Sequence, residues 1–153
     1  MGIDETWYQI FIADPEYATG DSVAAFATKL SEMTFAPFVE VHKSAELLPF
    51  FEDTINSGDC IYTPISSFLT SIRRISQIDW AFFFFTHTSL CPNLLNSTET
   101  LNCIQMACYT IQIMDNSYFI LYTNDPNLVN KVGETWVGSE IIKGPVKSLE
   151  IPF

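Results

Sequence analysis

Four consecutive phenylalanines, at 82–85 in the stretch WAFFFFTHT, are the feature that most constrains the fold. Successive side chains of a β-strand point to opposite faces of its sheet, so a strand with this sequence is apolar on both faces. Strands of that kind lie inside a sheet that other elements cover on both sides. We therefore predict a central, doubly covered strand over 78–88.

Helices are predicted wherever apolar residues recur every three or four positions. This spacing occurs over 21–33, 45–56 and 63–77. Thr63 is the expected cap of the last helix, and Pro64 its first residue, where a missing N–H costs no hydrogen bond. Segments rich in aromatic and β-branched residues predict strands at 6–13 and 36–42.

A β-hairpin is predicted at 103–123. Its strands, 103–114 and 117–123, flank Asp115 and Asn116. A two-residue turn requires positive φ, which Asn tolerates. The antiparallel hairpin argues against a purely parallel sheet, because parallel strands need long crossover connections.

The remaining segments complete an α+β pattern. A helix over 125–133, capped by Asp125 and ended by Gly133, precedes one or two short C-terminal strands. We predict a mixed sheet of five to six strands with three to four helices packed against it. One compact domain over 1–153 is expected, because a chain of this length that is 48% hydrophobic can bury a core unaided.

The chain is acidic, and its charge is unevenly distributed. The net charge is −11; the first 60 residues hold eleven acids and two bases, whereas the last 23 hold three of each. A field of this sign repels nucleic acids and anionic membranes, so we expect neither as a partner. A basic protein is the natural complement.

Acids of the first 60 residues gather in the loop ADPEYATGD and around the helix predicted at 45–56. Tyr17 and Phe51 lie among them and supply apolar anchors of the kind that protein interfaces favour. These acids and aromatics form the predicted partner-binding surface. Its residues are Asp14, Glu16, Tyr17, Asp21, Glu46, Phe51, Glu52, Asp53 and Asp59.

Motifs for chemistry are weak. His87 and Cys91 are suitable types for a base and a nucleophile, so an enzyme site around them remains an open alternative. Cys103 and Cys108 are zinc-ligand types, but their odd separation places them on opposite faces of the predicted strand. The chain also has no glycine-rich phosphate-binding loop. We therefore predict no metal, no cofactor and no enzymatic activity.

A cytoplasmic location is expected, because the N-terminal MGIDETWYQI lacks the basic start of a secretory signal. A small acidic domain without catalytic motifs matches the profile of an inhibitor that binds and occludes the active site of a basic partner. Bacterial immunity proteins, which neutralise nuclease toxins, have that profile. A nucleic-acid mimic is the second hypothesis, although a mimic favours acids spread along a longer surface. The third hypothesis is an enzyme with a cryptic site at His87 and Cys91.

Overall fold

The computed structural model of the chain describes residues 5–12, 19–42, 55–57, 60–88, 97–115 and 118–151. Its strands are β1 (Trp7–Phe11), β2 (Phe38–His42), β3 (Ile55–Ser57), β4 (Cys60–Pro64), β5 (Ala81–Thr86), β6 (Tyr109–Met114), β7 (Tyr118–Thr123) and β8 (Glu140–Gly144). Its helices are α1 (Gly20–Met33), α2 (Ile65–Ile72), α3 (Ser97–Met106) and α4 (Pro126–Thr135), with the 3₁₀ helix η3 at Val146–Ser148.

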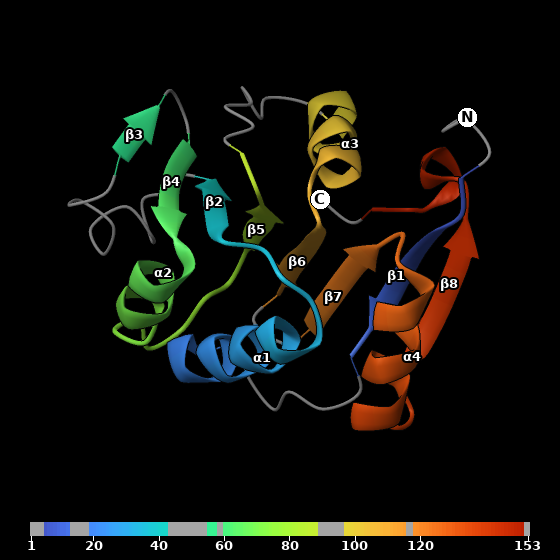
Figure 1. The fold of residues 1–153 in the computed structure, drawn as a ribbon, viewed down its shortest axis with the longest axis horizontal. Helices are drawn as coiled ribbons and strands as arrows, with labels where there is room; N and C mark the ends of the chain where they lie inside the picture. The colour runs from blue at the N-terminus through green and yellow to red at the C-terminus, as the bar shows by residue number, and fades with distance from the viewer. Residues whose placement is uncertain are drawn as a thin grey trace.

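The fold is α+β, as predicted, with one sheet of eight strands in the order β3-β4-β2-β5-β6-β7-β1-β8 (Figure 1). Every pairing among the described strands is antiparallel, so the sheet is larger than predicted and is not mixed. β1 and β2, which are joined through helix α1, run in the same direction. They are separated in the sheet by β5, β6 and β7, so they never pair.

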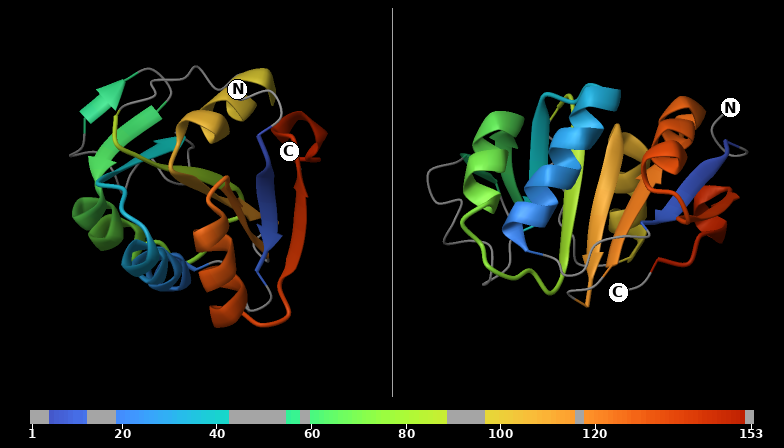
Figure 2. Two further views of the ribbon diagram at one scale, coloured as in Figure 1. Left: turned by 45° about the vertical axis from the view of Figure 1, so that its right-hand side comes forward. Right: turned by 90° about the horizontal axis from the view of Figure 1, so that it is seen from below.

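β5 confirms the prediction of a central strand covered on both faces. Phe83 and Phe85 are fully buried in the larger core, whereas Phe84 is buried in a second core with Trp7 and Ile104. We call the side of Phe83 and Phe85 the helical face and the side of Phe84 the second face. Figure 2 (right) shows α2, α1 and α4 side by side along the helical face. α3 and η3 belong to the second face.

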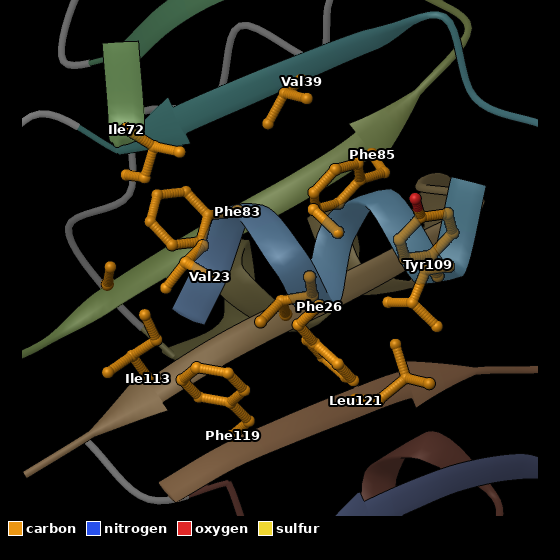
Figure 3. Close-up of a cluster of buried hydrophobic side chains, with 14 of the residues drawn as sticks. Val23, Phe26, Val39, Ile72, Phe83, Phe85, Tyr109, Ile113, Phe119 and Leu121 are labelled. Carbon is orange, nitrogen blue, oxygen red and sulfur yellow. The ribbon is translucent and has the colours of Figure 1, made fainter. Parts of the chain in front are cut away.

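Aromatic rings pack among aliphatic side chains in the core of the helical face (Figure 3). Phe68 of α2 meets the rings of Phe83 and Phe85 edge-on, with centroids 5.2 and 5.7 Å apart. Phe26 of α1 packs 5.2 Å from Phe119 of β7. The two edge-to-face pairs of Phe68 are each worth about 0.5–1.5 kcal/mol beyond the area that they bury.

α1 begins one residue earlier than predicted, at a capping box that the sequence analysis did not identify. Thr19 Oγ1 accepts a hydrogen bond from Ser22 N at 3.1 Å, and Ser22 Oγ accepts one from Thr19 N at 2.9 Å. The next residue, Gly20, donates its N–H to Ile75 O at 2.8 Å. A Cβ at Gly20 would overlap the carbonyl oxygens of Ile72 and Ile75, so only glycine allows this approach of two backbones.

The helix predicted at 45–56 falls mostly outside the described residues, and its last two positions lie in strand β3 instead. The next predicted helix begins later than expected, at Ile65. Thr63 and Pro64 belong to β4, where they pair with Val39 and Phe38 of β2. Sheet pairing therefore overrides the local capping signal, and Pro64 flanks the helix with extended backbone.

The predicted hairpin is confirmed over 109–123, but the prediction that its first strand begins at 103 is wrong. Cys103 and Ile104 are buried within helix α3 rather than in a strand. Gln105 and Met106 are exposed there, which is the one-sided burial of a surface helix. At the turn, Asp115 takes the positive φ, 53°.

α4 confirms the predicted N-terminal cap, because Asp125 Oδ1 accepts a hydrogen bond from Asn127 N at 2.9 Å. Pro126 is the first helical residue. The helix continues past Gly133 to Thr135. Within the described part of the chain, no helix has the length and apolar character needed to cross a membrane.

The two helical glycines should respond oppositely to alanine. Gly20→Ala should lower the free energy of unfolding by about 1–3 kcal/mol, because the new methyl group displaces the end of α2 from α1. Gly133→Ala meets no atom within 4 Å and should raise it by about 0.5–1 kcal/mol. Urea unfolding measures both. Equal effects of the two substitutions would contradict the backbone contact at Gly20.

Candidate protein-binding surface

The antiparallel register brings distant parts of the chain to one end of the sheet. β1, β2, β3 and β6 finish at this end, and β4, β5, β7 and β8 begin there. Exposed carboxylates follow this edge, so we call it the acidic end. They are Asp21 in the first turn of α1, Asp79 before β5, Asp115 after β6, Glu134 in the last turn of α4 and Glu140 at the start of β8.

Asp21 is the predicted binding residue that the structure describes, and it is exposed at the acidic end. The others lie outside the described residues: Asp14, Glu16, Tyr17, Glu46, Phe51, Glu52, Asp53 and Asp59. They belong to the connections that follow β1, β2 and β3, each of which finishes at the acidic end.

Four acids of the acidic end were missed by the sequence analysis: Asp79, Asp115, Glu134 and Glu140. They are spread over the second half of the chain, and the order of the strands is what brings them together. The only local signal is that each one lies at the end of a helix or strand. Arg73 and Arg74, exposed after α2, lie on the same side and reduce the charge without reversing it.

Two exposed aromatic side chains, Trp80 and Tyr118, accompany these acids with the thioether of Met114 between them, and we call the three residues the aromatic row. Trp80 is 41% exposed and Tyr118 is 53% exposed. Met114 pairs directly with Tyr118 across β6 and β7, and Ala81 pairs with Ile113, so Trp80 enters the sheet beside Met114. Trp, Tyr and Met are enriched in protein interfaces. The row therefore places apolar anchors next to carboxylates.

A buried polar network crosses the second face. Gln9 Nε2 donates to Tyr122 Oη at 3.1 Å, and Tyr122 Oη donates to Gln112 Oε1 at 2.7 Å. Gln9 Nε2 also donates to the carbonyl oxygen of Glu150 at 2.9 Å. Burial raises the pKa of the Tyr122 phenol, and the hydrogen bond from Gln9 partly opposes this. The network ties the C-terminal segment to three strands, which is a structural role.

Among the described acids of the first 60 residues, Glu40 is the one that is buried. It is fully buried on β2, where it pairs with Tyr62 of β4 and Phe84 of β5. Its carboxylate lies on the second face, within the sheet rather than at its end. Glu40 therefore contributes nothing to recognition at the acidic end.

His87 lies at the opposite end of the sheet, exposed just after β5. Its ring packs 5.6 Å from that of Phe35, which is 72% exposed. Cys91 falls outside the described residues, so the predicted pairing with His87 stays a hypothesis. Among the residues that the structure describes, His87 therefore lies beside an exposed ring rather than in the enclosed surroundings in which catalytic groups are usually tuned.

The other candidate ligands are dispersed. Cys103 is buried in α3, and Cys108 lies half-buried just ahead of β6. Burial raises the pKa of the Cys108 thiol, which disfavours the nucleophilic thiolate. In the described ranges, no three His, Cys, Asp or Glu side chains come together as a metal site.

Comparisons with protein-family models, with curated proteins and with solved structures found no match for this chain. The antiparallel sheet presents carboxylates and exposed aromatic side chains at one end. Such a surface can attract, orient and desolvate a basic protein.

Two buried tyrosines make a matched test of the polar network. Tyr122→Phe should lower the free energy of unfolding by about 1–3 kcal/mol, because buried Gln9 and Gln112 lose their shared hydroxyl. Tyr109→Phe should leave it unchanged or raise it, because the described residues offer the buried Tyr109 hydroxyl no hydrogen bond. Chemical unfolding gives both values. Similar losses in the two variants would refute a stabilising network.

Proposed function

We propose that this chain is a small acidic inhibitor of the cytoplasm that binds a basic partner and occludes its active site. In its specific form, the proposal is an immunity protein that neutralises a bacterial nuclease toxin. The observation that supports it best is the convergence of exposed acids and the aromatic row at one end of the sheet. A nuclease holds a phosphate backbone in a positively charged groove, and carboxylates carry the same sign as phosphates.

The carboxylates and the aromatic side chains would contribute to such a complex in different ways. The carboxylates steer the partner and align it, with association rates of up to about 10⁸–10⁹ per molar per second at low salt. The aromatic row supplies the desolvated centre that carries most of the binding free energy in typical interfaces. Exposed Trp80 and Tyr118 suit this central position, because each flanks an acid-bearing connection.

The aromatic row also favours this proposal over the nucleic-acid mimic. A mimic needs carboxylates spaced along an extended surface in place of a phosphate backbone. Here Trp80 and Tyr118 interrupt the acids at the sheet end. Apolar side chains at that position have no counterpart in a phosphate backbone but do match the core of a protein interface.

The direct test is capture followed by an activity assay. The tagged chain is incubated with lysate of its native host and of related strains at low and high salt, and bound proteins are identified by mass spectrometry. We expect a basic protein that is released at high salt and whose nuclease activity disappears when this chain is added. A captured protein that stays fully active in the complex would refute inhibition by occlusion.

Reversal of charge in the first acidic loop tests the electrostatic part. The triple variant Asp14→Lys, Glu16→Lys and Asp21→Lys should slow association by about 10- to 1,000-fold at low salt. Single substitutions are poor tests, because one exposed charge contributes about 0–1 kcal/mol.

The matched control changes the net charge equally at exposed acids elsewhere: Glu5→Lys, Glu32→Lys and Glu150→Lys. It should retain most of the association rate. Stopped-flow or surface-based kinetics with the captured partner distinguish the two triples. An equal loss in both would show that only total charge matters and would remove the argument for the acidic end.

Replacement of the aromatic row tests the apolar part. Trp80→Ala and Tyr118→Ala should each weaken binding by about 30-fold or more, chiefly through faster dissociation. Phe35→Ala is the control, because Phe35 is an exposed aromatic at the opposite end of the sheet. Calorimetry with the partner gives the affinities. Unchanged affinity in both row variants would show that the partner binds elsewhere.

A further inference from the structure

The outer edge of β8 is unpaired among the described strands. β8 ends the strand order, and β1 pairs with its inner side from Trp7 opposite Gly144 to Phe11 opposite Glu140. Neighbouring Ile141 and Ile142 point to opposite faces, yet they are 42% and 41% exposed. An edge strand with apolar side chains exposed on both faces is a template for another strand.

The hydrogen-bond pattern fixes which backbone groups point outward. Ile12 N donates to Phe119 O at 2.9 Å, so Ile12 directs its polar groups toward β7. Directions alternate along a strand, and Phe11 therefore directs its groups toward β8. Glu140, which lies opposite Phe11, therefore directs its backbone groups toward β1. Ile142, two residues further along β8, does the same. By the same alternation, the backbone groups of Ile141 and Lys143 point to the free side.

We propose that the outer edge of β8 pairs antiparallel with the same edge of a second copy of this chain, with Ile142 opposite Ile142 on the two-fold axis. In this register Ile141 of each copy exchanges backbone hydrogen bonds with Lys143 of the other. Ile142 forms the closer, non-hydrogen-bonded pair, in which side chains approach most tightly. A two-fold operator requires a self-complementary surface, and this register provides one.

The neighbouring symmetric register is less favourable. A two-fold axis at Ile141 would set Ser139 opposite Lys143 and would require the N–H of Ser139. That N–H already donates to Trp136 O at 3.2 Å. The register centred on Ile142 leaves this turn intact.

Charge also fits a second copy at this edge. The last 23 residues hold three acids and three bases, unlike the acidic first 60. Antiparallel pairing sets Glu140 opposite Gly144 of the other copy, on the second face, where Lys147 of η3 follows in that chain. The two acidic ends then point in opposite directions. At physiological salt the screening length is about 8 Å, so their mutual repulsion is weak.

Lys143 does not prevent this pairing. Lysine on an edge strand usually discourages association. In the proposed register it lies across from Ile141, so that its aliphatic stem covers the isoleucine and its amine remains in water. The same geometry limits growth, because each chain offers β8 once and the pair closes on itself.

A cysteine pair tests the register directly. In Ile142→Cys, the two introduced thiols lie directly opposite, with Cβ atoms about 4.5–5.5 Å apart before relaxation, close to disulfide geometry. In Ile141→Cys, each thiol faces Lys143 instead, and the copies are separated along the diagonal by about 7–8 Å. Ile141 is the matched control, because its exposed fraction, 42%, is nearly that of Ile142.

Both variants and the unaltered chain are oxidised with glutathione disulfide at physiological salt and resolved on a non-reducing gel. The four native cysteines give a common background. We expect a reducible dimer band that is several-fold stronger for Ile142→Cys than for Ile141→Cys. Equal bands, or no band above background, would overturn the proposed register.

Sedimentation of the unaltered chain gives a second readout that needs no cysteine. Its mass should rise toward that of a dimer with concentration, whereas Ile142→Lys, which sets two ammonium groups opposite each other, should remain monomeric. Circular dichroism confirms that the exposed substitution leaves the fold intact. A monomer at all concentrations of the unaltered chain would refute self-association, without bearing on the basic partner.

Discussion

Burial of β5 on both faces is the constraint on which the rest of the structure depends. Phe83 and Phe85 are covered by α1 and α2 on the helical face, and Phe84 is covered by α3 and the C-terminal segment on the second face. One strand thus requires two layers of cover, drawn from both halves of the chain. Because adjacent strands must continue the sheet on each side, β5 also determines that β2 and β6 are largely buried.

The phenylalanines do not, however, specify their own register. A shift of β5 by one residue exchanges one buried Phe for another, so its faces are nearly equivalent. The neighbouring strands supply the missing information. β2 alternates Val39, Glu40 and Val41, and β6 alternates Thr110 and Gln112 with isoleucines. Their polar residues share the second face, where Gln112 joins the network with Tyr122 and Gln9. A slip of β2 or β6 would place Glu40 or Gln112 in the core of the helical face, at a cost of about 1–3 kcal/mol for each one left unsatisfied.

Strong local patterns explain what the sequence predicted well. β1, α1, β2, β5 and α4 each combine a clear periodicity with a turn or cap signal, and each appears close to its expected range. The segment after Cys103 misled the analysis, because its apolar residues fit either period over so short a length. Pro64 was predicted to start a helix, but its pairing with Phe38 of β2 keeps it in strand β4, so the helix begins one residue later. In both cases a tertiary contact decided between two locally acceptable structures.

The candidate surface was less predictable than the fold for a related reason. Asp21 stood out because Asp14 and Glu16 closely precede it in the sequence, whereas Asp79 and Asp115 have no acid near them in theirs. Only the strand order makes them neighbours, and no local property of a single sequence encodes that order. Local composition therefore favoured the first 60 residues, while the structure extends the acidic end into the second half of the chain.

The two proposed contacts use different parts of the sheet and different forces. The acidic end relies on charge and on aromatic side chains, whereas the edge of β8 relies on backbone hydrogen bonds and two isoleucines. Glu140 is the residue that they share, since it begins β8 and also lies at the acidic end. Antiparallel pairing of β8 would set it on the same face as Lys147 of the second copy and partly neutralise it. Partner binding would then weaken slightly on pairing, and, because such coupling is reciprocal, a bound partner would weaken the pair to the same extent.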